Sequence, residues 1–250
     1  MAAKLHIGNL PVAPPPRVVG VISALSSVSG LLESARRPCD LVELRLDQMA
    51  TEPEAWRTSI HRLQGAGYPV LATLRLAAEG GNWTAPDADR WPLIEQMLAV
   101  ASAVDVELRS PLLVPTVKHA AQAGKVVVAS YHDFAQTPTD AELLAVLKQG
   151  ATHGPQVIIK LAVQINHDAD RIRLQALLTD PPVTNPLCII GMGPIGAGTR
   201  LTFPGLGSCL AYGHIDGATA PGQWSCHELQ QRLSSTPDPK DQKDYTHADS

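Results

Sequence analysis

Residues 125–132, KVVVASYH, and 156–163, QVIIKLAV, are apolar runs rich in β-branched residues, and Leu143, Leu144 and Leu147 recur between them at helical spacing. Runs of this length and composition are typical of buried strands. A helix that connects two such strands makes them lie parallel in one sheet. The segment therefore predicts a strand–helix–strand unit.

The same alternation continues in both directions along the chain. Further apolar runs cover residues 17–25, 40–47, 69–75, 103–109, 186–192 and 209–215. Eight strands with helices between them close naturally into a (β/α)8 TIM barrel, so we expect an α/β fold with one barrel domain over residues 1–233. A doubly wound open sheet is the alternative, but it would carry a glycine fingerprint after its first strand. The stretch SSVSGLLES at 26–34 has no such fingerprint.

Three segments depart from the regular pattern. Residues 193–208 are too short for a full crossover helix and predict a turn or two. Residues 4–10, KLHIGNL, predict a short strand or hairpin that closes the lower end of the barrel. Residues 234–250 are polar and contain proline, which predicts a disordered tail.

Composition excludes several classes of protein. The chain has 20 Lys and Arg against 24 Asp and Glu, a net charge of −4, so it lacks the basic surface of a nucleic-acid binder. With 44% hydrophobic and 18% charged residues it has enough apolar material for a large core. The first thirty residues show neither a signal peptide nor a transmembrane helix, so we expect a cytoplasmic protein with no membrane partner.

Charged side chains interrupt the predicted strands close to their carboxyl ends, where barrel enzymes build their active sites. They are Glu43, Arg45, Asp47, Arg75, Glu107, Arg109, His132 and Lys160. Side chains alternate along a strand, so Glu43, Arg45 and Asp47 should face the barrel mouth together. A single charge at a strand end can simply reach solvent, but the recurrence at successive strands indicates a site.

Lys160 and His132 suggest the chemistry of that site. Lys160 lies in an apolar strand among arginines, and both desolvation and nearby positive charge favour the neutral amine that attacks a carbonyl. The alternative is a lysine that reaches solvent or pairs with a core carboxylate. His132 can carry protons in both directions within one cycle. Neither residue belongs to a metal-ligand pattern, so we predict no metal and no cofactor.

Two loops complete the predicted mouth. The glycine-rich run 191–200 lacks the ending of a phosphate-binding loop, but it closes on Arg200, whose planar guanidinium suits a carboxylate. Residues 219–223, TAPGQ, indicate a loop that enters a helix, with Pro221 in the first turn and free N–H groups available to an anion.

These segments together resemble the type I 3-dehydroquinate dehydratase family, the Schiff-base enzymes of the shikimate pathway. The resemblance covers about residues 17–230 and rests on the order and spacing of its motifs. The motifs are VELRLD at 42–47, TLR at 73–75, EGG at 79–81, DVEL at 105–108, SYHDF at 130–134, IKLA at 159–162, GMG at 191–193, TR at 199–200 and APGQ at 220–223. Residues 83–90 and those beyond 231 contribute nothing to it.

The resemblance implies a lyase reaction and assigns roles. Lys160 would form an imine with the C3 ketone of 3-dehydroquinate, and His132 would remove the C2 proton and protonate the departing C1 hydroxyl in a syn elimination. Glu79 is expected to orient His132 or a lid. The implied substrate-binding residues are Glu43, Arg45, Arg75, Arg200, Thr219 and Gln223. The family often has serine at the positions of Thr199 and Thr219.

The resemblance also implies a small-molecule substrate and a homodimer, and one site would serve biosynthesis or quinate breakdown. Another Schiff-base barrel enzyme of the aldolase or transaldolase type would instead cleave a carbon–carbon bond and bind phosphate at the glycine-rich run. A non-catalytic barrel that senses dehydroquinate would need neither Lys160 nor His132.

Overall fold

The computed structural model describes residues 5–12, 14–49, 53–217 and 224–235. Its main sheet has eight parallel strands in the order β10-β3-β4-β5-β6-β7-β8-β9. They are β3 (Arg17–Ile22), β4 (Leu41–Arg45), β5 (Val70–Thr73), β6 (Ala103–Glu107), β7 (Val126–Asp133), β8 (Val157–Gln164), β9 (Leu187–Met192) and β10 (Leu210–His214). At the closure, the Cys209 N–H donates to the Leu187 carbonyl at 2.8 Å. The result is a nearly closed (β/α)8 barrel, as predicted.

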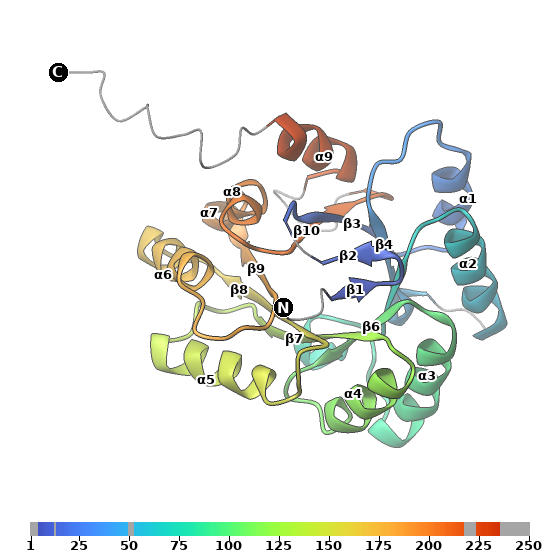
Figure 1. Cartoon of the computed structure of the whole chain (residues 1–250), viewed down its shortest axis with the longest axis horizontal. Coiled ribbons are helices and arrows are strands. Elements are labelled where there is room, and N and C mark those ends of the chain that lie inside the picture. The colour runs from blue at the N-terminus through green and yellow to red at the C-terminus, as the bar shows by residue number, and fades with distance from the viewer. Residues whose placement is uncertain (1–4, 13, 50–52, 218–223, 236–250) are drawn as a thin grey trace.

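Helices surround the strands in Figure 1. They are α1 (Ser26–Glu33), α2 (Pro53–Gly65), α3 (Asp87–Val100), α4 (Leu113–Gln122), α5 (Asp140–Ala151), α6 (Asp168–Thr179), α7 (Gly193–Gly196), α8 (Thr199–Gly205) and α9 (Cys226–Ser235), with single 3₁₀ turns η1 (Leu46–Gln48) and η2 (Ala77–Glu79). The seventh crossover contains α7 and α8, which together make about three helical turns, more than the expected turn or two. None of the helices within the described ranges is long and apolar enough to cross a bilayer.

Alternation along each strand divides the apolar side chains into two layers. One set packs between the strands and the helices, and it includes Val104, Leu161 and Ile189. The other set fills the lower interior of the barrel, and it includes Leu71 and Ile158. Because the strands are parallel, the inward-facing positions beyond this lower layer all lie toward the carboxyl ends of the strands.

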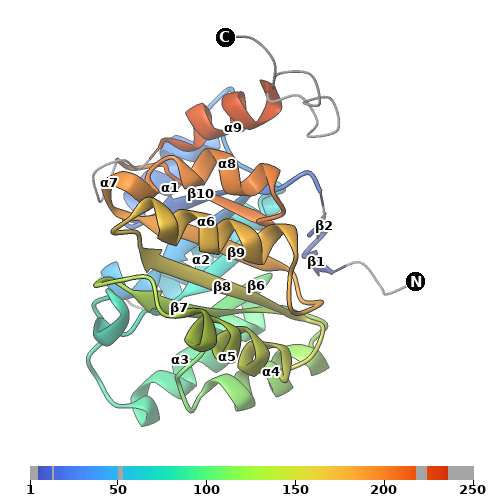
Figure 2. The same ribbon diagram turned by 90° about the vertical axis from the view of Figure 1, so that its left-hand side faces the viewer.

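A short hairpin closes the lower end of the barrel. Strand β1 (His6–Ile7) pairs antiparallel with β2 (Leu10–Pro11). Ile7 is fully buried against the inner layer, and the Arg17 side chain donates to the Pro11 carbonyl at 2.9 Å. Figure 2 shows the hairpin on the side of the molecule opposite α7, which follows the carboxyl end of β9. The predicted hairpin is therefore confirmed.

The last described helix, α9, has a well-defined beginning. The Ser225 N–H and hydroxyl both donate to the Glu228 carboxylate, and the Glu228 N–H donates back to the Ser225 hydroxyl, so this capping box begins α9 at Cys226. Pro221, which was expected in the first helical turn, lies outside the described residues. The predicted domain boundary at 233 falls in the last turn of α9, and residues 236–250 of the expected tail also lie outside the described part of the chain.

Candidate active site at the barrel mouth

The polar residues of the site lie on the inner face of the strands, two positions beyond the lower apolar layer. Thr73 lies two residues after Leu71 on β5, and Lys160 lies two residues after Ile158 on β8. A cavity of about 520 Å³ opens above them. Its lining includes Glu43, Arg45, Gln48, Arg75, Glu79, His132, Phe134, Lys160, Gln164, Met192 and Arg200. The strand-end pattern thus brings most of the predicted residues into one cavity.

Lys160 is held between a carboxylate and an aromatic ring. Its side chain is buried, with Nζ 3.4 Å from Asp105 Oδ2 and 4.3 Å from the centroid of the Tyr212 ring. The sequence predicted arginine neighbours and offered a core carboxylate as the alternative. Both are present, because Arg75 contacts the same Asp105 oxygen at 2.8 Å.

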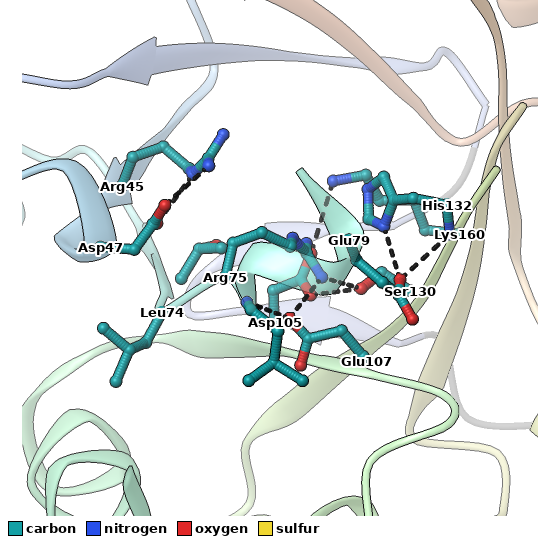
Figure 3. Close-up of polar contacts among 12 residues, drawn as sticks. Arg45, Asp47, Leu74, Arg75, Glu79, Asp105, Glu107, Ser130, His132 and Lys160 are labelled. Carbon is teal, nitrogen blue, oxygen red and sulfur yellow. Dashed lines mark hydrogen bonds and ion pairs between the residues drawn. The ribbon is translucent and has the colours of Figure 1, made fainter. Parts of the chain in front are cut away.

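Arg75 is the centre of a buried network, shown in Figure 3. It contacts Asp105 and donates to Glu107 at 3.0 Å and to the Ser130 hydroxyl, which itself donates to Asp105 at 2.6 Å. Burial alone would raise the pKa of Asp105, but Arg75 and Lys160 hold it below the ordinary value. Burial opposes the charge of Arg75, yet Asp105 and Glu107 outweigh it and raise the pKa of the guanidinium. Both groups therefore stay charged.

His132 and Glu79 form a second pair. Glu79 Oε2 lies 2.9 Å from His132 Nδ1 and also accepts the His132 backbone N–H at 3.1 Å. Burial raises the pKa of Glu79 to about 7. Burial also lowers the pKa of His132 well below its ordinary value, and the positive charges of Arg75, Lys160 and Arg45 add to that effect. The imidazole is therefore neutral near pH 7. The Phe134 ring stacks on it with centroids 6.2 Å apart.

The end of β4 differs from the predicted geometry. Glu43 faces the cavity and accepts a 2.6 Å hydrogen bond from Thr73. The strand ends at Arg45, so Asp47 lies in the 3₁₀ turn η1 and does not continue the alternation. Asp47 instead accepts two hydrogen bonds from Arg45, at 3.0 and 2.8 Å, as Figure 3 shows. Asp47 is thus a support for Arg45 and not a third cavity-facing group.

Arg109 also lies outside the cavity lining. It follows the end of β6, is exposed, and its guanidinium lies 4.2 Å from the centroid of the Tyr131 ring. Tyr131 belongs to the outer apolar layer, and Arg109 does not line the cavity, although its charge still acts to lower the pKa of Glu79.

The glycine-rich run positions Arg200. The Thr199 hydroxyl accepts the Gly191 N–H at 3.0 Å and donates to the Gly196 carbonyl at 2.6 Å, which folds the run onto itself. A Cβ on Gly196 would lie 2.5 Å from the Gly191 carbonyl carbon, so this approach requires glycine. Arg200 then lines the cavity and donates to the Tyr212 carbonyl at 3.3 Å. Burial lowers the pKa of its guanidinium.

Two predicted substrate-binding residues, Thr219 and Gln223, lie outside the described residues. Two contacts of Lys160 were missed as site residues. Asp105 lies two positions before Glu107 on β6, so the alternation of side chains predicts both carboxylates on the same inner face. Tyr212 resembles any other aromatic residue of a core strand, and only the three-dimensional closure of the barrel brings its ring to Lys160.

Comparisons with known proteins agree with this geometry. The family model described as "Type I 3-dehydroquinase" matches residues 18–237. The 3-dehydroquinate dehydratase of Methanocella arvoryzae is 32% identical over 88% of this chain and 96% of its own length, and that of Methanosarcina barkeri is 32% identical over 92% and 98%. A crystal structure of the 3-dehydroquinate dehydratase from Aquifex aeolicus superposes with a TM-score of 0.77 at 29% identity, over 86% of this chain and 96% of that one.

Because the family model spans most of the barrel and the curated relatives match over nearly their full length, the chain belongs to the type I 3-dehydroquinase family.

Proposed function

We propose that this chain is a hydro-lyase that converts 3-dehydroquinate to 3-dehydroshikimate through an imine on Lys160. The observation that carries the proposal is that the Lys160 amine and the His132 imidazole line one cavity with Arg75 and Arg200. Family membership and the names of the curated relatives support this substrate. An amine beside a proton-transfer group and cationic side chains suits a keto acid.

The proposed reaction passes through an iminium ion and an enamine on Lys160. The Lys160 ammonium gives up a proton and its amine attacks the C3 ketone. The carbinolamine takes up one proton and loses one water, which gives an iminium ion. His132 takes the C2 proton, and the electron pair moves into an enamine. The enamine then expels the C1 hydroxyl, which leaves as water with the proton from His132. One water then hydrolyses the conjugated iminium and returns Lys160 as its ammonium, so the net change is the loss of one water.

Asp105 and Tyr212 suit the charge that develops in this sequence. The iminium nitrogen is Lys160 Nζ, which already lies 3.4 Å from the Asp105 carboxylate and over the Tyr212 ring. A fixed negative charge and an aromatic face both stabilise a buried cation. Because Asp105 stays ionised, it supplies that charge without having to lose a proton.

His132 is arranged to work as a base. Its neutral ring can accept a proton near pH 7, since burial lowers the imidazole pKa. The bond between Nδ1 and Glu79 fixes the ring orientation and leaves Nε2 for the transfer. An ionised Glu79 also stabilises the imidazolium that forms when the proton is taken up.

The remaining polar groups are assigned to substrate binding. Glu43 and Arg45 would hold ring hydroxyls, Arg75 would bind the substrate from the floor of the cavity, and Arg200 would bind the carboxylate. Thr219 and Gln223 keep the binding roles that the resemblance implies for them.

The test is turnover of 3-dehydroquinate by the purified protein, followed by the ultraviolet absorbance of the conjugated product. We expect product with the wild type and a loss of about 10⁴-fold or more with Lys160→Met, which removes the nucleophile. Lys125→Met is a matched control, since Lys125 bonds the Leu98 carbonyl on the outer part of the barrel. Binding of dehydroquinate without turnover by the wild type would contradict the proposal and favour a sensor.

We also propose a homodimer, which the family resemblance supports, and a cytoplasmic location, which is the one expected from the sequence. Light scattering on the purified chain tests the dimer, and cell fractionation tests the location. A monomer, or a secreted chain, would contradict these two assignments without affecting the reaction.

A further inference from the structure

Arg90 is a fully buried arginine that does not line the cavity. It lies in the first turns of α3, in the helical layer outside the barrel. Its Nη2 donates to the Leu74 carbonyl at 2.7 Å and to the Glu107 carboxylate. Residues 83–90 contributed nothing to the family resemblance, so the sequence assigned Arg90 no role.

The partners of Arg90 flank Arg75 on both sides. Arg90 holds the carbonyl of Leu74, the residue before Arg75. Glu107 Oε1 accepts the backbone N–H of Leu76, the residue after it, at 3.0 Å. The same oxygen accepts from Arg75 Nη1 at 3.0 Å. Arg90 therefore holds the backbone before Arg75, and Glu107 holds both the backbone after Arg75 and the Arg75 guanidinium.

Charge balance gives Arg90 a second effect. Arg75 contacts two buried carboxylates, Asp105 and Glu107, and cannot neutralise both. Arg90 supplies the second cation to Glu107. Without it, Glu107 would hold the Arg75 charge more completely and leave less of it for an anionic ligand.

Arg90 is costly to bury. Its Nε and Nη1 are buried without a hydrogen-bond partner among the described residues, and a buried guanidinium with unpaired nitrogens opposes folding. Replacing a buried ion pair with apolar side chains is often neutral or stabilising. A purely structural anchor between α3 and the barrel would gain little from this arrangement.

We propose that Arg90 is a positioning residue for substrate binding, which acts through Glu107 to aim Arg75 into the cavity. The inference rests on the proposed function, because it takes the ligand of Arg75 to be the anionic substrate. Arg90 touches no reacting atom, so it should set substrate affinity more than the rate of the chemical steps.

The experiment compares kcat and KM for 3-dehydroquinate in Arg90→Met, Arg90→Lys, Glu107→Gln and the double variant Arg90→Met with Glu107→Gln. Arg173→Met is the matched control, since Arg173 makes comparable bonds to Asp140, Asp170 and the Pro138 carbonyl but does not line the cavity. Urea unfolding of each variant reports stability separately from kinetics.

Arg90→Met should raise KM about tenfold and change kcat less than about threefold, the pattern of a lost binding contact. Arg90→Lys keeps the charge but not the fork, so its KM should rise less. In the double variant the uncompensated carboxylate is gone, and KM should return to within about threefold of Glu107→Gln alone. Arg173→Met should leave KM unchanged.

A wild-type KM in Arg90→Met, with or without lower stability, would overturn the inference and make Arg90 a structural anchor. If Arg90→Met does not fold, Arg90→Lys decides, and an unchanged KM in that variant overturns the inference equally. Absence of product from the wild type is a different result, because it rejects the proposed function itself before any variant is compared.

Discussion

The two ends of the barrel interior are built on the same strands and the same inward-facing positions, yet they have opposite chemistry. At the lower end, Leu41, Leu71 and Ile158 form an apolar layer closed by Ile7 of the hairpin. Two residues further along the strands, the same face carries Glu43, Thr73 and Lys160. A lower layer of apolar side chains stabilises the fold by removing area from water. An upper layer of buried charges costs stability unless every charge is paired.

The difference shows how the barrel can hold a reactive lysine. The upper layer is stable as a set, because Arg75 and Lys160 balance Asp105, and Arg75 and Arg90 share Glu107. Removing one member leaves another buried charge unpaired. Mutations in the upper layer should therefore change the chemistry as well as the stability, and mutations in the lower layer should change the stability alone.

After Lys160→Met, His132→Ala should show the largest effect in the upper layer. Without the imidazole the C2 proton has no positioned base, so kcat should fall about 10²–10⁴-fold. Imine formation on Lys160 should persist, and borohydride should still trap it during the slowed cycle. Turnover at the wild-type rate would contradict the assignment of His132 as the proton carrier.

Ile158→Ala is the matching change in the lower layer, two residues before the nucleophile on β8. The fully buried side chain leaves a cavity, so the free energy of unfolding should fall by about 2–5 kcal/mol. Under conditions in which the variant is folded, its kcat and KM should stay within about twofold of the wild-type values, because the two layers share no partners. A large loss of kcat at full folding would show that the layers are not separable.

The ionisation of Glu79 should make kcat/KM depend on pH near neutrality. Its pKa is raised to about 7, so the carboxylate that orients His132 is lost as the pH falls through that value. We expect kcat/KM to fall about tenfold between pH 8 and pH 6, following the ionised fraction. Glu79→Gln should remove this acid limb and lower the plateau. Persistence of the limb in Glu79→Gln would assign it to another group.

Tyr212→Phe should have the smallest effect. The Tyr212 hydroxyl is buried without a partner among the described residues, while its ring faces Lys160. Deleting an unsatisfied hydroxyl should leave the free energy of unfolding unchanged or raise it by about 1 kcal/mol. Turnover should be preserved because the ring remains, whereas Tyr212→Leu should slow it. Loss of activity in Tyr212→Phe would mean that the hydroxyl itself takes part.

The lower layer and the strand order were predictable because apolar runs and their spacing report burial directly. The hairpin at residues 6–11 and the short seventh crossover were equally readable from local length and pattern. Lys160 and His132 could be identified because a charge within an apolar strand needs a reason.

The contacts between side chains of different strands were harder to predict from the sequence. Asp105 reaches Lys160 across the intervening β7, which depends on register and on how far each strand extends. Asp47 was misplaced because β4 ends at Arg45 and turns, and no residue between them marks that end clearly. Arg90 acts through Glu107, 17 positions along the chain, and no local pattern relates the two.

The most direct test of the imine on Lys160 is to incubate the wild type with 3-dehydroquinate, reduce it with borohydride and locate the adduct by mass spectrometry. The imine requires a lysine side chain at the mouth, and the structure puts Lys160 there with Asp105 and Tyr212 around it. We expect one reduced adduct, on Lys160, that is absent from Lys160→Met. Product formation with no adduct, or an adduct on a lysine outside the cavity, would contradict this expectation.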